Sequence, residues 1–181
     1  MSNPVPVTPV TSLDMALIEI ERALQAHLYY LALISTLSLI DMCAALEDED
    51  GETNQTKFRA WYSKNLAEHY TWLSDQDCYG LRCGILHRGV MDHAVRKKPK
   101  STWNRIAFSL PDANGNTVRQ MAMEDFYCTG LAEFCQDVTA RVRAWADNAK
   151  HNPIVRKNAE NLMRYHPNGI APYFVGMQIF G

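Results

Sequence analysis

The chain has 181 residues, of which 47% are hydrophobic and 21% charged, and its formal net charge is −2. This length suits one domain with a sizeable core, and the composition is that of a globular protein and not of a disordered or fibrous one. Because the net charge is close to zero, any affinity for nucleic acid has to come from a local basic patch.

Several classes of protein are disfavoured by what the sequence lacks. No apolar run of about 18 residues is free of polar interruption, so we expect no membrane-spanning helix. The first residues lack the basic start and apolar core of a secretion signal, and we expect a cytoplasmic protein. There is no Cys-x-x-Cys pair, no Glu-x-x-His pair and no phosphate-cradling glycine loop, so we expect neither a metal nor a cofactor. The cysteines are expected to be reduced, core-type thiols; they are Cys43, Cys78, Cys83, Cys128 and Cys135.

The first half of the chain is predicted to be helical after a short arm. Residues 1–11 contain three prolines and are expected to form a flexible, extended arm. Apolar side chains at helical spacing predict one long first helix over residues 12–46, which is apolar nearly all round from residue 28 and so suits a central position. An acidic loop should follow, then a second helix over 56–73 and a third over 75–95.

The second half of the chain is predicted to begin with β structure and then to return to helix. Residues 102–121 predict a β-hairpin with Asn114 and Gly115 in its turn. A last long helix is predicted over 124–149, a shorter one over 154–165, and an extended tail over about 166–181. Residues 12–181 are therefore expected to form a single, mainly α domain with the hairpin inserted before its last long helix.

The third predicted helix carries the most informative residues, Arg82 and His87, five positions apart beside Gly80 and Gly84. An arginine is a permanent cation suited to phosphate, and a histidine can exchange a proton near neutral pH. The spacing alone is weak evidence, because it recurs at Arg22/His27 and Arg88/His93. His27 is expected to be a packed core residue, and Arg88/His93 to be solvated.

The surrounding residues resemble the signature of the HEPN (higher eukaryotes and prokaryotes nucleotide-binding) superfamily, all-helical proteins with an Arg-x4–6-His motif. In particular, the segment looks like that of a group of uncharacterised bacterial HEPN-like proteins with a Tyr-x-Leu-Arg-Cys-x-x-Leu-His pattern. The matching residues are Tyr79, Leu81, Arg82, Cys83, Leu86 and His87. The resemblance implies a HEPN-like helical bundle.

The resemblance also implies a function: RNA binding or metal-independent endoribonuclease activity by a homodimer. His87 would act as general base on a ribose 2′-hydroxyl, or as acid for the leaving 5′-oxygen, and Arg82 would hold the phosphate. Neighbouring basic residues could receive the RNA backbone; they are Arg88, Arg96, Lys97, Lys98 and Lys100.

Structural, non-catalytic roles remain open for the same residues. Arg82 and His87 lie about 140° apart on an ideal helix, and Arg82 could simply pair with Asp75 or Asp77. The basic run could be a solvated helix end. Cys83 stands where many catalytic HEPN proteins have a polar residue, so the alternative function is an inactive module that binds a partner protein or a nucleotide.

Overall fold

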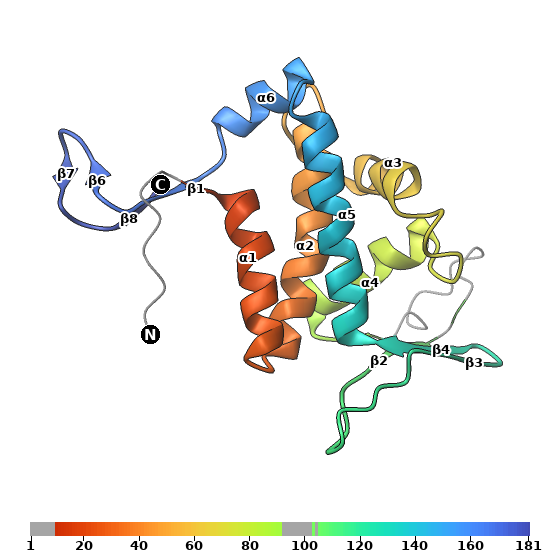
Figure 1. Cartoon of the computed structure of the whole chain (residues 1–181). Helices are drawn as coiled ribbons and strands as arrows, with labels where there is room; N and C mark the ends of the chain where they lie inside the picture. The colour runs from red at the N-terminus through yellow and green to blue at the C-terminus, as the bar shows by residue number, and fades with distance from the viewer. Residues whose placement is uncertain (1–9, 92–102, 104) are drawn as a thin grey trace.

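A computed structural model describes residues 10–91, 103 and 105–181 of the chain. In these residues six helices and three small sheets make a mainly α protein, which confirms the predicted fold class at this level (Figure 1). The helices are α1 (Ser12–Gln25), α2 (Tyr29–Glu47), α3 (Gln55–Asn65), α4 (Asp75–Arg88), α5 (Leu131–Ala149) and α6 (Pro153–Glu160). Residues 1–9 of the predicted arm lie outside the described part of the chain.

Helix α2 forms the centre of the bundle, as its all-round apolar sequence predicts. It contacts α1, α3, α4, α5 and α6, and its fully buried residues include Leu37, Leu39 and Ile40. Among the described helices α2 alone is long and apolar enough to cross a membrane, but half of it is buried inside the bundle. Its apolar surface is therefore used as the core of the fold.

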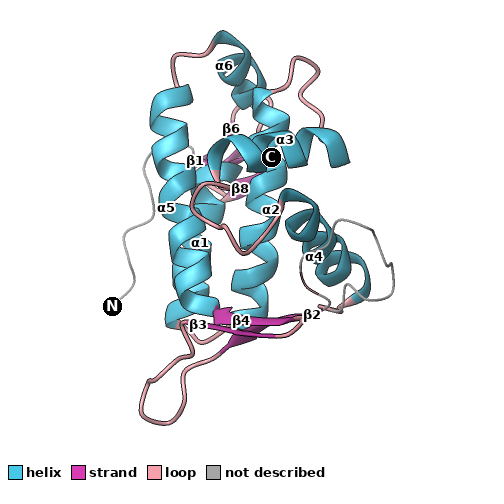
Figure 2. Cartoon of the chain, turned by 90° about the vertical axis from the view of Figure 1, so that its right-hand side faces the viewer, coloured by secondary structure: helices cyan, strands magenta, loops and turns pink. Residues whose placement is uncertain are grey.

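The predicted single helix over 12–46 is wrong, because the chain reverses direction at His27. This residue has the left-handed backbone conformation, with φ of 58°, and it separates α1 from α2. The two helices consequently pack side by side as a hairpin (Figures 1 and 2). His27 is exposed, and its Nδ1 lies 2.8 Å from the Tyr29 hydroxyl, so the expectation of a core histidine is wrong as well.

The β structure before α5 also differs from the predicted hairpin over 102–121. Strand β2 (Arg105–Ser109) pairs in parallel with β4 (Phe126–Gly130), and β3 (Gln120–Met123) forms the antiparallel hairpin with β4. Asn114 and Gly115 do lie in a turn, which Asp112 organises by accepting hydrogen bonds from two backbone amides. The chain after this turn runs on to β3, and β4 takes residues predicted to be helical, so α5 begins at Leu131. The sheet lies under one end of the bundle (Figure 2).

Short strands at the two ends of the described chain form the other sheets. Strand β1 (Val10–Thr11) pairs with β5 (Arg164–His166), and β5 pairs with β8 (Ile179–Phe180). Between them, β6 (Gly169–Ile170) and β7 (Phe174–Val175) form a small hairpin. The predicted tail is thus extended, and it is organised into strands.

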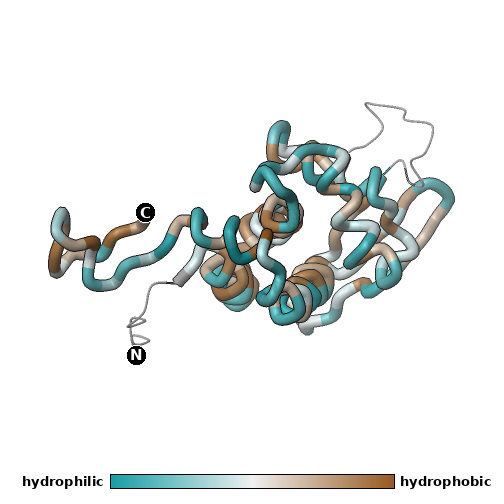
Figure 3. The backbone as a smooth tube through the Cα atoms, turned by 90° about the horizontal axis from the view of Figure 1, so that it is seen from above, coloured by the Kyte–Doolittle hydropathy of each residue, from teal (hydrophilic) through white to brown (hydrophobic). Residues whose placement is uncertain are grey.

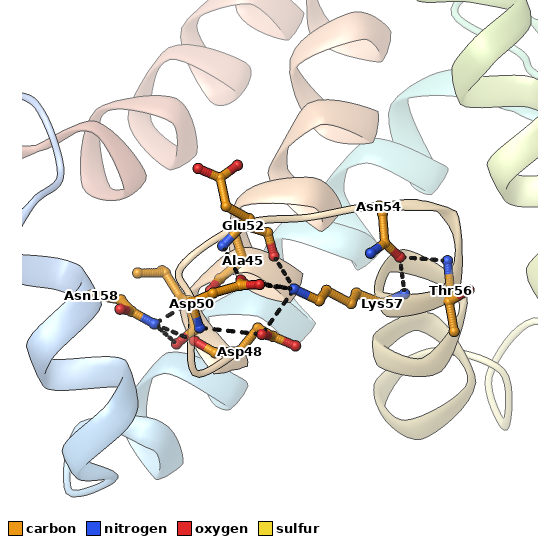
Figure 4. A network of polar contacts seen from close by, with 9 residues as sticks. Ala45, Asp48, Asp50, Glu52, Asn54, Thr56, Lys57 and Asn158 are labelled. Carbon is orange, nitrogen blue, oxygen red and sulfur yellow. Dashed lines mark hydrogen bonds and ion pairs between the residues drawn. The ribbon is translucent and has the colours of Figure 1, made fainter.

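The acidic loop after α2 is fixed by specific polar contacts. Lys57 Nζ lies 2.9 Å from Asp48 Oδ1 and 2.7 Å from Asp50 Oδ1 (Figure 4). From the other side, Asn158 Nδ2 donates to the backbone carbonyls of Leu46 and Asp48 at 3.1 and 2.6 Å. These contacts tie the end of α2 to α3 and α6.

Candidate functional site

Helix α4 places the Arg82/His87 motif in its second half, and the local sequence explains both of its ends. Ser74 caps the start by accepting a hydrogen bond from the Asp77 backbone amide at 3.0 Å. Gly89 ends the helix in the left-handed conformation, with φ of 65°. The helix is therefore shorter than the predicted 75–95 segment, and His87 lies in its last turn.

Gly84 matters because the chain folds back against it after α4 ends. The Val90 amide donates to the Gly84 carbonyl at 3.1 Å, and a Cβ built on Gly84 would lie 2.5 Å from the Val90 carbonyl oxygen. The absence of a side chain at this position thus allows the return of the chain after α4.

Replacing this glycine should destabilise the protein. In an open helix Gly→Ala stabilises by about 1 kcal/mol, but at Gly84 we expect a loss of about 1–3 kcal/mol because backbone has to move. Urea unfolding of Gly84→Ala measures this change. His87→Ala, at an exposed position of the same helix, is the matched control, and a more stable Gly84→Ala protein would contradict the close approach.

The two side chains of the motif meet, although their positions on an ideal helix point apart. Arg82 Nη1 lies 3.1 Å from His87 Nε2. The long arginine side chain reaches round the helix to make this contact. A guanidinium only donates hydrogen bonds, so a hydrogen bond between the two side chains requires the tautomer in which Nε2 accepts and Nδ1 carries the proton. His87 itself is exposed, so the pair is open to a ligand.

Asp41 of α2 completes the group, and our sequence analysis did not find it. Arg82 Nε donates to Asp41 Oδ2 at 2.6 Å, with side-chain exposures of 20% and 14%. The expected partners are otherwise engaged: Asp75 pairs with Arg59 at 2.8 Å, and the Asp77 carboxylate accepts from Ser74. The only sequence signal for Asp41 is that it is the first charged residue after a long uncharged run in α2.

The surroundings of Asp41 and Arg82 keep the Arg82 guanidinium charged and hold it in place. Burial raises the pKa of Asp41 above its ordinary value, while the hydrogen bond and charge of Arg82 oppose that rise. Burial also acts against the charged form of Arg82, but Asp41 and Cys83 outweigh it and raise the pKa of Arg82. Arg82 is therefore a fully charged group whose Nε is held by Asp41 and whose Nη1 lies beside His87.

Other residues of the Tyr-x-Leu-Arg-Cys-x-x-Leu-His pattern, and Trp103, pack between α4 and its neighbours. Tyr79 is half-buried against the core, with its ring 5.3 Å from that of Phe58 in an edge-on arrangement. Leu81 is buried, and Cys83 Sγ lies 3.9 Å from Arg82 Nη1. Trp103 packs on the core and donates its indole N–H to the Trp72 carbonyl at 2.6 Å. Tyr79 and Trp103 therefore contribute to the packing of the core.

The predicted RNA-binding residues are only partly within the described chain. Arg88 is exposed at the end of α4, one residue beyond His87. The others fall outside the described residues; they are Arg96, Lys97, Lys98 and Lys100. His93 lies outside them too. Only Arg88 can thus be placed beside the motif.

Other polar features of the described chain lie away from this motif. No group of three or more His, Cys, Asp or Glu side chains that could hold a metal occurs among the described residues. A hollow of about 260 Å³ lies between the end of α2 and α3 and is lined in part by Glu47, Lys57, Trp61 and Lys64. Its lysines already pair with acidic residues of the same region, so it offers no free cation.

The cysteines can be tested by their reactivity. All five are free, and Cys83 alone is partly exposed. Burial raises the pKa of Cys43 and Cys78 well above the ordinary range, and that of Cys135 to about 11. The thiolate is the reactive form, so at about pH 8 the native protein should show one fast thiol with DTNB. Cys83→Ser should remove this fast phase, and a fast phase of two or more thiols would contradict the burial of the others.

Comparison with known proteins adds no relative. No family model, curated protein or solved structure matches the chain. The membership of the HEPN superfamily implied by the motif therefore stays a prediction, and the proposed function is based on the geometry of Asp41, Arg82 and His87.

Proposed function

We propose that this chain is an RNA-binding protein and metal-independent endoribonuclease of HEPN type that acts as a homodimer. Arg82 and His87 are the proposed catalytic pair. The proposed path of the RNA backbone follows the basic residues Arg88, Arg96, Lys97, Lys98 and Lys100.

The contact between Arg82 Nη1 and His87 Nε2 is the observation that supports this proposal best. It brings a fixed cation and an imidazole nitrogen within hydrogen-bonding distance at an exposed position. A phosphodiester oxygen would compete with His87 for the terminal nitrogens of Arg82, because an anion is the stronger acceptor. Binding of the phosphate would then free His87 Nε2 beside the ribose.

The proposed reaction uses the ribose as its nucleophile. His87 Nε2 takes the proton of the 2′-hydroxyl, and the 2′-oxygen forms a bond to phosphorus. The bond between phosphorus and the 5′-oxygen breaks, and the leaving oxygen takes a proton from water. In the reverse assignment, water takes the proton of the 2′-hydroxyl and protonated His87 gives its proton to the leaving oxygen. In both, Arg82 stabilises the negative charge that builds up on the phosphate oxygens.

Cleavage of single-stranded RNA by the purified full chain in excess EDTA tests the proposal. We expect products with 2′,3′-cyclic phosphate and 5′-hydroxyl ends, because no water attacks phosphorus in this step. A matched RNA with 2′-O-methyl groups should not be cut. Cleavage of that RNA, or cleavage that requires added Mg²⁺, would refute the mechanism.

A second candidate function rests on the ion pair between Arg82 and Asp41. The pair joins α4 to α2. It gives the Arg82 charge a partner within the same chain, as expected of a residue with a structural role. In that case the protein is a catalytically inactive HEPN-like module that binds a protein or a nucleotide. It predicts that Arg82→Ala lowers the melting temperature while the wild type has no activity on RNA.

A further inference from the structure

The C-terminal extension, residues 163–181, stands off from the helical bundle. Its strands pair with one another and with β1, and Figures 1 and 3 show them projecting to one side of the helices. None of its residues belongs to the buried core. The extension is thus held by backbone pairing, and its side chains remain available.

The surface of this extension is apolar and has no charged side chain after Arg164. Its exposed apolar residues are Met163 (48%), Tyr173 (80%), Phe174 (51%), Val175 (76%), Met177 (58%) and Phe180 (46%). Soluble proteins seldom expose so many large apolar side chains together unless another surface covers them.

A second exposed apolar patch lies at the hairpin between α1 and α2. It consists of Leu28 (50%), Tyr30 (55%) and Leu31 (53%). The segment from Leu28 to Ile40 contains no charged residue. Neither apolar surface would therefore have to bury a charge from the other.

The two surfaces cannot cover each other within one chain. The extension adjoins the N-terminal end of α1 through β1, whereas the α1–α2 patch lies at the opposite end (Figure 1). The 14 residues of α1 separate them by about 21 Å at the helical rise per residue. Two copies with antiparallel α1 helices, however, would place each extension on the α1–α2 patch of the other.

We infer that the C-terminal extension docks on the α1–α2 patch of a second copy of this chain, and that this exchange forms a two-fold dimer. In a two-fold dimer each pair of contacting surfaces occurs twice. This is possible here because every chain carries both the extension and the α1–α2 patch. Weighted by their exposed fractions, and at about 150 Å² for a large side chain, the nine side chains of the two surfaces offer about 800 Å² per protomer. That is about the area per partner of a stable interface. This dimer specifies the contact of the homodimer in the proposed function, and it does not depend on whether Arg82 and His87 cleave RNA.

Sedimentation velocity of the whole chain tests this dimer. We expect a dimer of the 20.6 kDa chain that dissociates on dilution. Val175→Asp in the extension and Leu31→Asp in the patch should each raise the dissociation constant at least tenfold, while the circular dichroism spectrum stays unchanged. Met123→Asp is the matched control, because Met123 is an exposed apolar residue (61%) of β3, outside both surfaces. A monomeric wild type, or a dimer that survives both substitutions, would overturn the proposal.

Cross-linking distinguishes this geometry from other dimers. Val175→Cys and Leu31→Cys proteins, each made in a Cys83→Ser background, are mixed and treated with a short bis-maleimide. We expect covalent dimers in the mixture and none in either protein alone. Cross-links in Val175→Cys protein alone would mean that two extensions pair with each other. A monomeric wild type whose binding to phosphatidylcholine vesicles is lost in Val175→Asp would instead make a membrane the occupant. Either result would refute the exchange.

Discussion

RNA cleavage by the His87→Ala variant is expected to fall by a factor of about 10²–10⁴, which is the usual loss when a general acid or base is removed. In the proposed mechanism His87 is the group that exchanges a proton with the ribose or the leaving oxygen, and none of its described neighbours on α4 can replace it. The measurement is the single-turnover rate on one RNA in EDTA.

This variant separates catalysis from folding, because His87 is exposed and its one described hydrogen bond is to Arg82. Substitutions at such positions change the free energy of unfolding by about 0.5 kcal/mol or less. The melting temperature should therefore hardly move. His69→Ala, at another exposed histidine, is the control and should cleave as the wild type does. Activity that survives His87→Ala in a pure preparation would remove the catalytic assignment.

The helical part of the fold could be predicted because its signals are local. Ser74 and Asn54 cap helices at the expected places, and Gly89, which is also a local signal, ends α4 before the predicted residue 95. The all-round apolar sequence of α2 correctly predicted the central helix. In each case the residue that sets the structure lies within a few positions of the structure that it sets.

The break between α1 and α2 and the strand pairing could not be predicted in this way. No proline or glycine marks the turn at His27; the chain adopts a left-handed conformation there because burial of α1 against α2 outweighs the local cost. Similarly, β4 occupies residues whose helical pattern continues that of α5. Its strand form depends on partners on both sides, β2 and β3.

The residues of the candidate site also differ in whether local sequence could reveal them. Arg82 and His87 were found from a motif within one helix, but Asp41 lies 41 residues from Arg82 in the sequence. Nothing in the motif specifies a carboxylate on another helix. Only the packing of α2 against α4 brings it to the guanidinium, so its role as a positioning residue emerges from the three-dimensional structure.

Arg82→Ala is expected to lower both activity and stability. Removal of a donor that stabilises transition-state charge costs about 10²–10³ in rate. It also leaves the Asp41 carboxylate, with 14% of its side chain exposed, without its cationic partner. Breaking a fully buried pair costs about 3–5 kcal/mol, and we expect about 1–3 kcal/mol here because both groups retain contact with water. Single-turnover rates and urea unfolding measure the two effects.

Arg82→Lys and Asp41→Asn are the matched variants that separate these effects. Lysine keeps the charge near Asp41, but a single ammonium cannot reproduce the planar fork that contacts Asp41 and His87 together. We therefore expect Arg82→Lys to recover most of the stability and little of the activity. Asp41→Asn should keep Arg82 available for phosphate but orient it less well, with a smaller loss of rate than Arg82→Ala. If instead Arg82→Lys restores both quantities, a point charge suffices and the fixed guanidinium geometry has no catalytic role. If both variants alter only stability, and RNA is never cut, Asp41 and Arg82 join two helices of an inactive module.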